Sequence, residues 1–549
     1  MNKMELAFFE EQYNSALSMR DKTLFKMGGC LLITLLFTGF CMLSLPGITL
    51  PLFQLLSALG VWALCKEEMA DGLKSFLRFS PTANSFHVFA LIAAAGHAIY
   101  CMTAENPLCP NLFAGVLFLG IGLSMAVKYF YLLQIIQNLD LVRDKKTYAL
   151  QVTDLSLSKK YIRQVCSANP LVDFPNVLRT SFESDPVQKK NRRFAPFVAL
   201  GVLVASIFLA VVHEGIFFTA LFSLLIICAS FGADLAFHLP YILMQMQLRK
   251  LGSILLGNYS VEHLKEADTL LVKDTDLFPP ENNEVLNIRL RKPALRNEVF
   301  RYTETLLKLS ESPAHDAFLR AAGEIAAPQP TVLQWRVIKN YGIVATVNMD
   351  NVLLGNRNLM LSHNLQPWTP DREAMLSAAG VHLMYLAING EIMATMIFRY
   401  AEDGDLKRSA ELLGGDFHLL VDTKDCNINE TMIQRRYDLS HTKISVPDSD
   451  EAESVVETRE ELEEDQSPPV MISTQNALGI LESIRRAKLL HNTVDLCILL
   501  QQISVLFGLG LTFLALLIAP EKLNWIWLFC FNFLWALPIP AIALYPKKR

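Results

Sequence analysis

The stretch Ala267-Asp268-Thr269-Leu270-Leu271-Val272-Lys273-Asp274-Thr275-Asp276 decides the fold of the soluble part of this chain. Its apolar part, Ala267–Val272, predicts a β-strand, and a charged run follows directly after it. Asp274 and Asp276 form an Asp-x-Asp pair in this run. Two carboxylates in this position after a strand can bind Mg²⁺ together. We therefore expect a functional site with polar side chains at the end of this strand.

The segment 246–490 around this stretch mixes strand-like runs with helical runs. The other strand-like runs are Tyr341–Val347, Leu383–Ile388, Glu391–Phe398 and His418–Val421, and the helical runs are Asn297–Ser310, Ala314–Ala322 and Asp405–Leu413. Such a mixture predicts an α/β domain. Near the end of the segment, Asp448–Asp465 holds ten carboxylates, which predicts a solvated, disordered loop.

Long runs with almost no charge dominate the rest of the chain, in which 52% of the 549 residues are hydrophobic. Met27–Cys65 carries no charge and is interrupted by Pro46, Gly47 and Pro51, which predicts two membrane spans joined by a turn. Further apolar runs lie at about 82–102, 110–136, 194–213, 215–245, 494–519 and 523–545. Each is long enough to cross a hydrocarbon core of about 30 Å. We expect about eight spans, in the order four, two and two.

Lysine and arginine gather on one side of these spans. They precede the first span and fill 143–193 and 246–490, whereas the turns on the other side hold only Lys522. The positive-inside rule then places both termini and both large loops in the cytoplasm. We expect a multi-pass protein of the cell membrane, surrounded by the lipid bilayer, whose cytoplasmic domain can meet a protein partner and which does not bind nucleic acid.

Short motifs occur in a fixed order between about 225 and 400. They are His238-Leu239-Pro240, the Asp268-Thr269 lead-in to the opening stretch, Ser310-Glu311-Ser312-Pro313, Gly342-Ile343-Val344 and Val352-Leu353-Leu354-Gly355-Asn356-Arg357. With the order of the spans, they resemble the heavy-metal branch of the P-type cation-transporting ATPases. The resemblance implies a multi-pass α-helical membrane protein with a cytoplasmic α/β domain of the haloacid-dehalogenase-like class, which carries an inserted α+β nucleotide-domain-like module.

The resemblance also implies a division of the chain into domains. It gives an N-terminal membrane region of four helices at 1–136, a short cytoplasmic loop in place of the actuator domain at 137–193, a transmembrane hairpin at 194–245, a degenerate phosphorylation-like domain at 246–279 and 381–490, a nucleotide-domain-like insertion at 280–380, and a C-terminal transmembrane hairpin at 491–549. The loop 137–193 contains Val152-Thr153-Asp154, then a stretch rich in lysine and arginine that looks helical, and then Glu183, which could echo the dephosphorylating glutamate of the family.

The phosphate-accepting aspartate of the family opens an Asp-Lys-Thr-Gly-Thr motif, and Lys273 stands in its place. A lysine cannot be the carboxylate nucleophile of that reaction. The glycine-rich hinge motif that helps to bind the metal is also missing, because there is no glycine between Gly415 and Gly479. The alternative acceptor is Asp274, with Asp276 as its partner. A slip of one residue would turn that side chain to the opposite face of the strand, unless a loop bulge absorbs the slip.

The resemblance implies that the protein binds ATP together with Mg²⁺. The residues that would bind the nucleotide are Ser312, Pro313, Gly342, Gly355 and Asn356. Ser312 replaces a histidine of the family motif. Asn340 replaces a glycine, and its side chain would obstruct the close approach of the backbone to a ligand. We therefore expect weak or absent ATP binding.

The ion path of the family is changed as well. Its Cys-Pro-Cys motif maps onto Phe231-Gly232-Ala233, so that the thiolate ligands for a soft metal are absent there and no metal site is expected. The ionisable or polar residues that remain in the spans are Asp234, His238 and Pro240 (the expected kink proline) together with Gln501, Gln502 and Asn532. Asp234 is either part of a polar path or paired within the protein.

Three functions follow from these observations. The first is a P-type-ATPase-like membrane protein that is catalytically inactive and has a regulatory or interaction role. The second is a divergent cation-transporting ATPase that uses Asp274 as phosphate acceptor. The third is a membrane scaffold without nucleotide binding.

Overall fold

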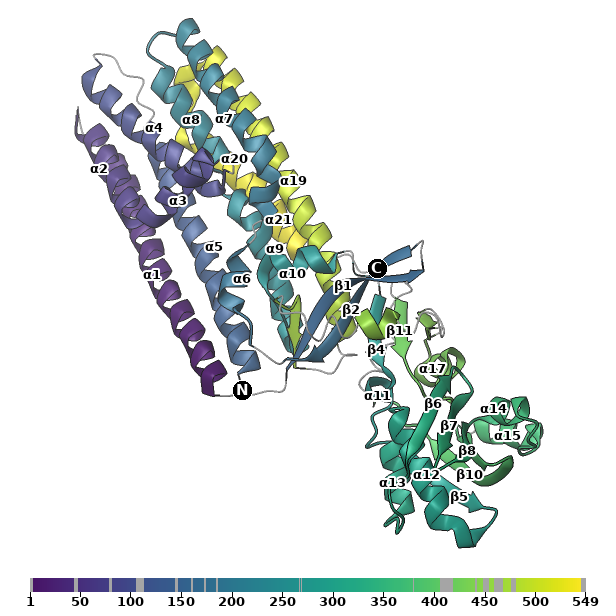
Figure 1. The fold of residues 1–549 in the computed structure, drawn as a ribbon. Coiled ribbons are helices and arrows are strands. Elements are labelled where there is room, and N and C mark those ends of the chain that lie inside the picture. Colours follow the sequence, from purple (N-terminus) through teal and green to yellow (C-terminus); the bar gives the residue numbers. More distant parts are fainter. Residues whose placement is uncertain are drawn as a thin grey trace. The chain divides into compact units, whose positions relative to one another are not determined.

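The structure is a computed structural model of the whole chain (Figure 1). It describes residues 3–43, 48–78, 81–104, 113–143, 147–158, 161–171, 174–183, 186–265, 267, 269–378, 380–404, 418–439, 442–447, 454–458, 468–474 and 480–544. The chain forms two compact units. The helical unit comprises Met1–Lys145, Asp173–Lys265 and Arg486–Arg549, and the soluble unit comprises Lys146–Val172 and Glu266–Arg485.

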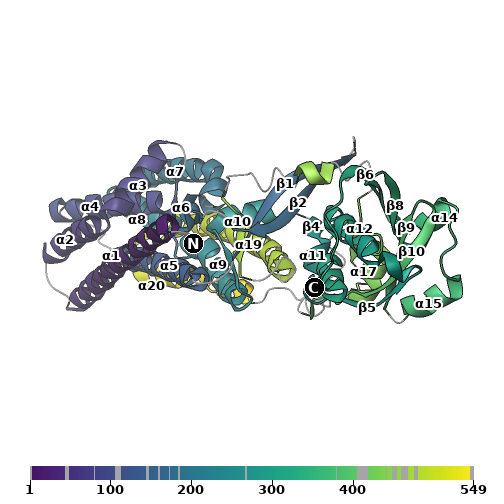
Figure 2. The ribbon, with the colours of Figure 1, turned by 60° about the horizontal axis from the view of Figure 1, so that its bottom comes forward.

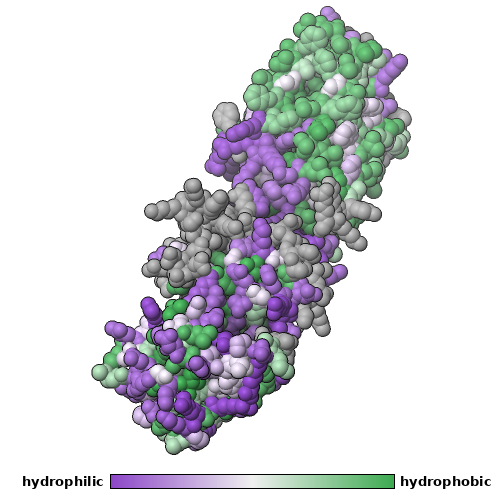
Figure 3. Space-filling view, turned by 90° about the vertical axis from the view of Figure 1, so that its right-hand side faces the viewer, coloured by the Kyte–Doolittle hydropathy of each residue, from purple (hydrophilic) through white to green (hydrophobic). Residues whose placement is uncertain are grey.

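The helical unit is built from helices, most of which are apolar. They are α1 (Lys3–Met42), α2 (Thr49–Leu64), α3 (Lys66–Leu77), α4 (Ala83–Thr103), α5 (Phe113–Val142), α7 (Pro186–Val212), α8 (Phe217–Cys228), α9 (Gly232–Lys250), α19 (Ile480–Ile518), α20 (Trp525–Ala536) and α21 (Pro538–Leu544). Among the described residues, seven helices are long and apolar enough to cross a membrane, or eight when the bent pair α2–α3 counts as one span. Hydrophobic residues cover the visible surface of this unit (Figure 3). The expected multi-pass architecture is confirmed.

Several helices extend beyond the apolar runs from which the spans were predicted. α1 begins at Lys3 and α19 at Ile480, well before the first apolar residue of either run. The residues that precede the apolar part are rich in glutamate, lysine, arginine and glutamine, which favour a helix as readily as leucine does. Shorter elements of the same unit are α6 (Val177–Glu183), β3 (Ser253–Leu255), α10 (Gly257–Leu264) and a 3₁₀ turn at Pro520–Lys522.

The break in the span that contains α8 and α9 differs from the expected one. α8 ends at Cys228 and α9 begins at Gly232, whereas Pro240 lies inside the continuous helix α9. A side chain at Gly232 would meet Oε1 of Gln501 at 2.5 Å, and Gln501 also donates a hydrogen bond to Ser230. The helix is therefore interrupted where α19 approaches it closely, and Pro240 is not the breaking residue.

The soluble unit contains a sheet with the strand order β12-β11-β4-β2-β1-β13. These strands are β12 (Lys443–Ser445), β11 (His418–Asp422), β4 (Thr269–Lys273), β2 (Tyr161–Pro170), β1 (Tyr148–Ser158) and β13 (Met471–Ser473). β12, β11, β4 and β2 are parallel, and β1 is antiparallel to β2 and β13. The opening stretch of the sequence therefore forms a central strand, as predicted, although Asp268 itself lies outside the described residues.

The hairpin of β1 and β2 corrects one prediction. The stretch after Asp154 was expected to be helical, but β1 and β2 run as strands to Pro170, and β2 pairs in parallel with β4. Figure 2 shows the hairpin beside β4. Alternation of apolar and polar residues, as in Leu150-Gln151-Val152-Thr153, is typical of a strand, and the Lys/Arg content of the segment obscured this signal.

A second sheet of the soluble unit is antiparallel, with the strand order β5-β10-β9-β8-β7-β6. Its strands are β5 (Glu284–Leu290), β10 (Glu391–Arg399), β9 (His382–Ile388), β8 (Asp350–Gly355), β7 (Gly342–Val347) and β6 (Val332–Ile338). The helices around the two sheets are α11 (Asp274–Leu277), α12 (Arg296–Leu309), α13 (His315–Ala322), α14 (Arg357–Ser362), α15 (Pro370–Ala378) and α17 (Glu430–Tyr437), with a 3₁₀ turn at Pro293–Leu295. The expected boundary at residue 380 falls inside this sheet, because β9 and β10 join the strands that precede them in the chain.

Two expectations concern residues that are only partly described. The predicted helix Asp405–Leu413 lies outside the described residues. Of the acidic run Asp448–Asp465, only 454–458 are described, and they form one helical turn. Val455 in this turn is fully buried against Leu271 and Leu420 of the parallel sheet. This part of the acidic run is therefore packed on the sheet and is not a solvated loop.

Gly342 and Gly355 face each other in the β7–β8 ladder. Gly342 has a φ of +140°, and a Cβ there would lie 2.2 Å from the carbonyl oxygen of Leu354. A Cβ at Gly355 would lie 2.2 Å from the carbonyl oxygen of Tyr341. Both glycines, which the resemblance assigned to nucleotide binding, are thus required by the close approach of two strands.

We expect Gly342→Ala to lower the stability of the soluble unit by at least about 2–3 kcal/mol, because backbone strain and the clash with Leu354 add. Gly323→Ala is the matched control. Gly323 also has a positive φ, of +68°, but nothing lies within 4 Å of its missing Cβ, so that only the backbone cost of about 1–3 kcal/mol remains. Calorimetry of the purified full chain measures both. Equal melting temperatures for the two variants would contradict the packing argument.

Candidate functional site

The ends of β4 and β11 place two polar side chains next to each other. The two strands are parallel, with Lys273 opposite Asp422, so that Asp274 and Thr423 follow at the same level of the sheet. Thr423 Oγ1 donates a hydrogen bond of 2.6 Å to Asp274 Oδ2. Parallel strands gather their polar ends at one edge of the sheet, which is the usual position of a binding site in an α/β fold.

The two residues at the end of β4, Lys273 and Asp274, differ in exposure. Asp274 is 5% exposed, whereas Lys273 is an exposed residue. Burial raises the pKa of the Asp274 carboxyl well above its ordinary value, and the nearby charges of Asp425 and Asp422 raise this pKa further. The hydrogen bond from Thr423 opposes these effects. The carboxyl at this position is therefore held in its protonated form over a wider pH range than an ordinary aspartate.

Asp276, the second carboxylate of the pair, caps the start of α11. The backbone N–H of Lys273 donates to Asp276 Oδ2 at 3.2 Å. Burial raises the pKa of Asp276 as well, while the same hydrogen bond and the charge of Lys273 oppose this shift. Lys273 and Asp274 line a cavity of about 50 Å³ together with Thr423 and Lys424. This volume is about that of one or two water molecules.

Ser312 takes part in a buried network that centres on Asp425. Ser312 Oγ and the Tyr400 hydroxyl both donate to the Asp425 carboxylate, and the Tyr400 bond to Oδ2 measures 2.9 Å. The backbone N–H of Asn427 donates to Asp425 Oδ1 at 2.9 Å. The next residue, Pro313, accepts a hydrogen bond of 2.9 Å from Asn283 Nδ2 through its carbonyl oxygen. The two residues therefore connect segments inside the unit and do not line the larger cavity described next.

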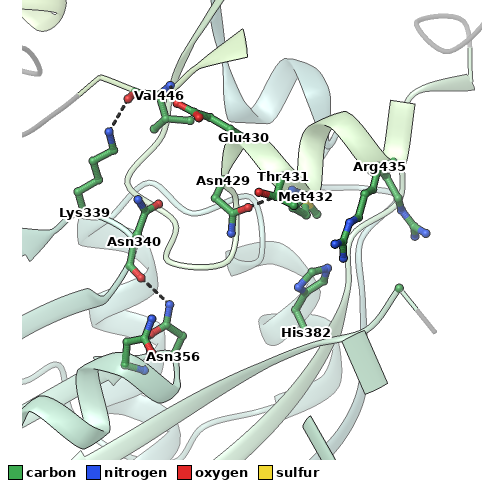
Figure 4. Close-up of a pocket in the computed structure, with 13 residues that line it drawn as sticks. Lys339, Asn340, Asn356, His382, Asn429, Glu430, Thr431, Met432, Arg435 and Val446 are labelled. Atoms are coloured by element: carbon green, nitrogen blue, oxygen red, sulfur yellow. Dashed lines mark hydrogen bonds between the residues drawn. The ribbon is translucent and has the colours of Figure 1, made fainter. Parts of the chain in front are cut away.

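A cavity of about 920 Å³ lies elsewhere in the soluble unit, and its lining is strongly polar (Figure 4). The basic side chains are Lys339, Arg435 and Arg436, and the amide side chains are Asn340, Asn356, Asn358 and Asn429. Figure 4 shows Lys339 and Arg435 on opposite sides of the cavity. The volume is in the range of small-molecule sites, and the donors are suited to an anionic group.

Local backbone geometry shapes this cavity. Asn340 adopts a left-handed conformation with φ +57°, and its carbonyl oxygen accepts a hydrogen bond of 2.6 Å from Asn356 Nδ2. Asn356 also caps α14 by accepting from the N–H of Asn358 at 2.9 Å. His382 lines the cavity near Arg436, and its pKa is lowered to about 4 by burial and by the charge of Arg436. His382 is therefore neutral at physiological pH.

Of the five residues predicted to bind a nucleotide, only Asn356 lines the large cavity. Sequence reasoning missed Lys339, His382, Arg435 and Arg436, which come from segments far apart in the chain. The adjacent residues Arg435 and Arg436 can be read in the sequence as a pair of positive charges. Their position beside β9 cannot, because it depends on the tertiary fold. Arg436 is also engaged in a 3.0 Å ion pair with Glu402, which fixes its position.

The helical unit brings together only some of the predicted ion-path residues. Ser124 of α5 donates a hydrogen bond to the Asp234 carboxylate, and His238 Nδ1 donates to the Asp234 carbonyl oxygen at 2.9 Å. These three residues line a cavity of about 170 Å³. Asp234 is thus paired within the protein, at the wall of a small polar cavity.

The other predicted ion-path residues have separate partners. Gln501 donates to Ser230, Gln502 donates to Asn191 at 2.9 Å, and Asn532 donates to the Leu528 carbonyl oxygen at 3.0 Å. In the described part of the chain, no group of three or more His, Cys, Asp or Glu side chains is arranged to hold a metal ion. Glu183, the candidate dephosphorylating residue, ends α6 in the helical unit and lies 3.8 Å from Arg179.

An ion-pair network on the same cavity was missed from the sequence. Glu68, which is 4% exposed, lies 2.9 Å from Lys26 and 3.0 Å from Lys128. Lys26 also contacts Glu67 at 2.7 Å. Glu68 stands directly after a predicted span, and its two lysine partners come from α1 and α5, so that only the helix packing brings the three charges together.

The whole chain is similar to solved structures of one class of membrane protein. A zinc-transporting PIB-type ATPase, captured with phosphate in one state of its cycle, matches with 12% sequence identity and a TM-score of 0.53, over 96% of this chain and 99% of that chain. A second structure of a zinc-transporting PIB-type ATPase, in another state, matches with 12% identity and a TM-score of 0.47, over 95% and 99% of the two chains. No protein-family model and no curated protein sequence matches the chain.

The fold is therefore that of a P-type ATPase. The first of these similarities confirms the predicted fold class and, at the level of the fold, the resemblance to the heavy-metal branch. At 12% identity, the similarity describes the path of the backbone and leaves the chemistry to the residues of this chain.

We expect Asp274→Asn to remove a loss of stability at high pH. The folded state keeps a proton on Asp274 that the unfolded chain releases above about pH 4. The wild type therefore loses stability as the pH rises through the raised folded-state pKa, whereas asparagine has the same size and no charge. The melting temperature of the variant, relative to the wild type, should rise with pH and be constant below about pH 4. Asp371→Asn, on α15, controls for the substitution, and a difference that is independent of pH would contradict the buried, protonated Asp274.

Proposed function

We propose that this chain is a P-type-ATPase-like membrane protein that forms no phosphoenzyme and acts as a regulatory, ligand-binding protein. Its soluble unit and both termini would lie in the cytoplasm, in accordance with the positive-inside rule. The observation that carries the proposal is the state of Asp274, which is buried, hydrogen-bonded to Thr423 and raised in pKa.

A carboxylate nucleophile has to be ionised and open to the phosphate that it attacks. Asp274 meets neither condition, because it is 5% exposed at the wall of a cavity of about 50 Å³. Lys273, the exposed side chain at the end of β4, brings a positive charge to the edge of the sheet in place of a nucleophile. Phosphoryl transfer also needs Mg²⁺ next to the acceptor, and the raised pKa of Asp274 disfavours the ionised form that would bind it.

The large cavity supports the ligand-binding part of the proposal. Lys339 and Arg435 reach it from opposite sides, and asparagine side chains complete its wall. A ligand that carries phosphate groups suits this donor set. Since the resemblance implies ATP, we propose weak nucleotide binding without hydrolysis at this cavity.

A divergent cation pump that uses Asp274 is the second candidate. It is favoured by the side-by-side position of Asp274 and Thr423 at the ends of two parallel strands. The polar cavity at Asp234, His238 and Ser124 would then belong to an ion path. In this case substrate binding would have to open the site and ionise Asp274.

Labelling of the purified full chain with radioactive ATP separates the two candidates. We expect no acid-stable, hydroxylamine-sensitive phosphoenzyme, because Asp274 is buried and its raised pKa disfavours the ionised form that would attack a phosphate. The measurement is repeated with Asp274→Asn, which keeps the size of the side chain. Labelling of the wild type that disappears in this variant would establish the divergent pump and overturn the proposal.

Nucleotide binding is measured as a shift in thermal unfolding with a non-hydrolysable ATP analogue. A site filled at a hundredfold excess over the dissociation constant stabilises the protein by about 2.7 kcal/mol. Arg435→Ala should reduce the shift, because it removes a cavity cation. Lys308→Ala is the control, since Lys308 is an exposed lysine of α12 that is not part of the cavity wall. If the wild type shows no shift, nucleotide binding at this cavity is contradicted, and a membrane scaffold that binds no nucleotide is the better description.

A further inference from the structure

Two buried thiols from different helices meet inside the helical unit. Cys30 Sγ of α1 lies 3.6 Å from Cys65 Sγ, and both residues are fully buried. The two cysteines are 35 residues apart in the chain, so that their contact is created by the packing of α1 against the bend between α2 and α3. This pair takes no part in the proposed nucleotide function.

Cys65 stands at a special point of the backbone. It ends α2 and begins α3, and the two helices meet at an angle of 85°. The first N–H groups of a helix lack partners in the preceding turn and create a positive potential at its start. This position favours the thiolate form of a cysteine. On the other side of the pair, Lys26 lies one helical turn before Cys30, and its charge is paired with Glu67 and Glu68.

The surroundings of the pair are rich in soft sulfur. Met27 precedes Cys30 by three residues and Met69 follows Cys65 by four, so that each methionine lies on the same side of its helix as the cysteine. Met69 belongs to the hydrophobic cluster that contains the two thiols, and Met27 is partly buried and packs against this cluster. Thiolate and thioether sulfur select Cu(I) over hard cations.

We propose that Cys30 and Cys65 form a binding site for a soft monovalent metal ion of the Cu(I) or Ag(I) class. Binding replaces two S–H protons by two metal–sulfur bonds, so that one Cu(I) ion enters and two protons leave. Two metal–sulfur bonds in line, each about as long as a Zn–S bond of about 2.3 Å, place the sulfur atoms about 4.6 Å apart. Metal binding therefore has to move the two sulfur atoms apart from their present distance of 3.6 Å.

Zinc is not the expected ion at this pair. A structural zinc site needs four ligands in a tetrahedron, and the pair supplies two. The site also lies apart from Phe231-Gly232-Ala233, where the family carries its own cysteines, since it uses α1 and the α2–α3 bend instead of α9. The proposal therefore stands or falls independently of phosphoenzyme formation and of nucleotide binding.

The test is an anaerobic titration of the reduced, purified full chain with Cu(I) in the presence of a competing chromophoric chelator. We expect the wild type to retain one equivalent of Cu(I) more than Cys30→Ser and Cys65→Ser do. Cys228→Ser and Cys497→Ser are the controls, because both residues are buried cysteines of the spanning helices and should leave this equivalent unchanged. Retention of Cu(I) in the double variant Cys30→Ser/Cys65→Ser, or an equal loss in the controls, would overturn the proposal.

X-ray absorption of the loaded wild type provides a measurement that does not depend on how well the variants fold. It should show copper bound to sulfur only. Nitrogen or oxygen neighbours around the copper would contradict the site. A parallel titration with Zn(II) should leave no zinc that depends on Cys30 or Cys65, and zinc that is lost from both variants would overturn the assignment of the ion class.

Discussion

The hydrogen bond from Thr423 to Asp274 is the constraint on which the site of the soluble unit depends. It joins the ends of two parallel strands, and both residues line the small cavity at this edge of the sheet. Burial and the charges of Asp425 and Asp422 raise the pKa of the Asp274 carboxyl, and the hydrogen bonds from Thr423 and from the backbone of Thr275 oppose this rise only in part. The hydrogen bond therefore holds a carboxyl whose ionised form is disfavoured.

Much of the fold was predictable from local patterns. Thr269–Lys273, Gly342–Val347 and His418–Asp422 are strands within one or two residues of the prediction, because each is a short apolar run with a clear end. The spans followed from hydropathy. The β1–β2 hairpin was not predictable in the same way, because its stability depends on pairing with β4, about a hundred residues further along the chain. The burial of Val455 in an acidic run likewise depends on a sheet formed elsewhere.

The candidate site was predictable in position but not in detail. The opening stretch identified the end of β4, yet no local pattern reveals that Lys273 keeps an extended backbone while Asp274 starts a helix and turns inward. Ser312 was assigned to a nucleotide from a motif resemblance, whereas its partner in the structure is Asp425, 113 residues away. Gln501 and Asp234 were grouped by residue type, although the structure gives them different partners. In each case, the missing information is a contact between distant segments.

The position of β2 in the parallel sheet has a mechanical consequence. β2, which lies between α5 and α7 in the chain, is in the same ladder as β4, with Val165, Cys166 and Ser167 in register with Thr269, Leu270 and Leu271. A strand cannot rotate away from its neighbour without breaking the hydrogen bonds of the ladder, each worth about 1 kcal/mol in net terms. β2 and the paired part of β4 are therefore held together. A conformational change that separates these two strands has to break the hydrogen bonds between them.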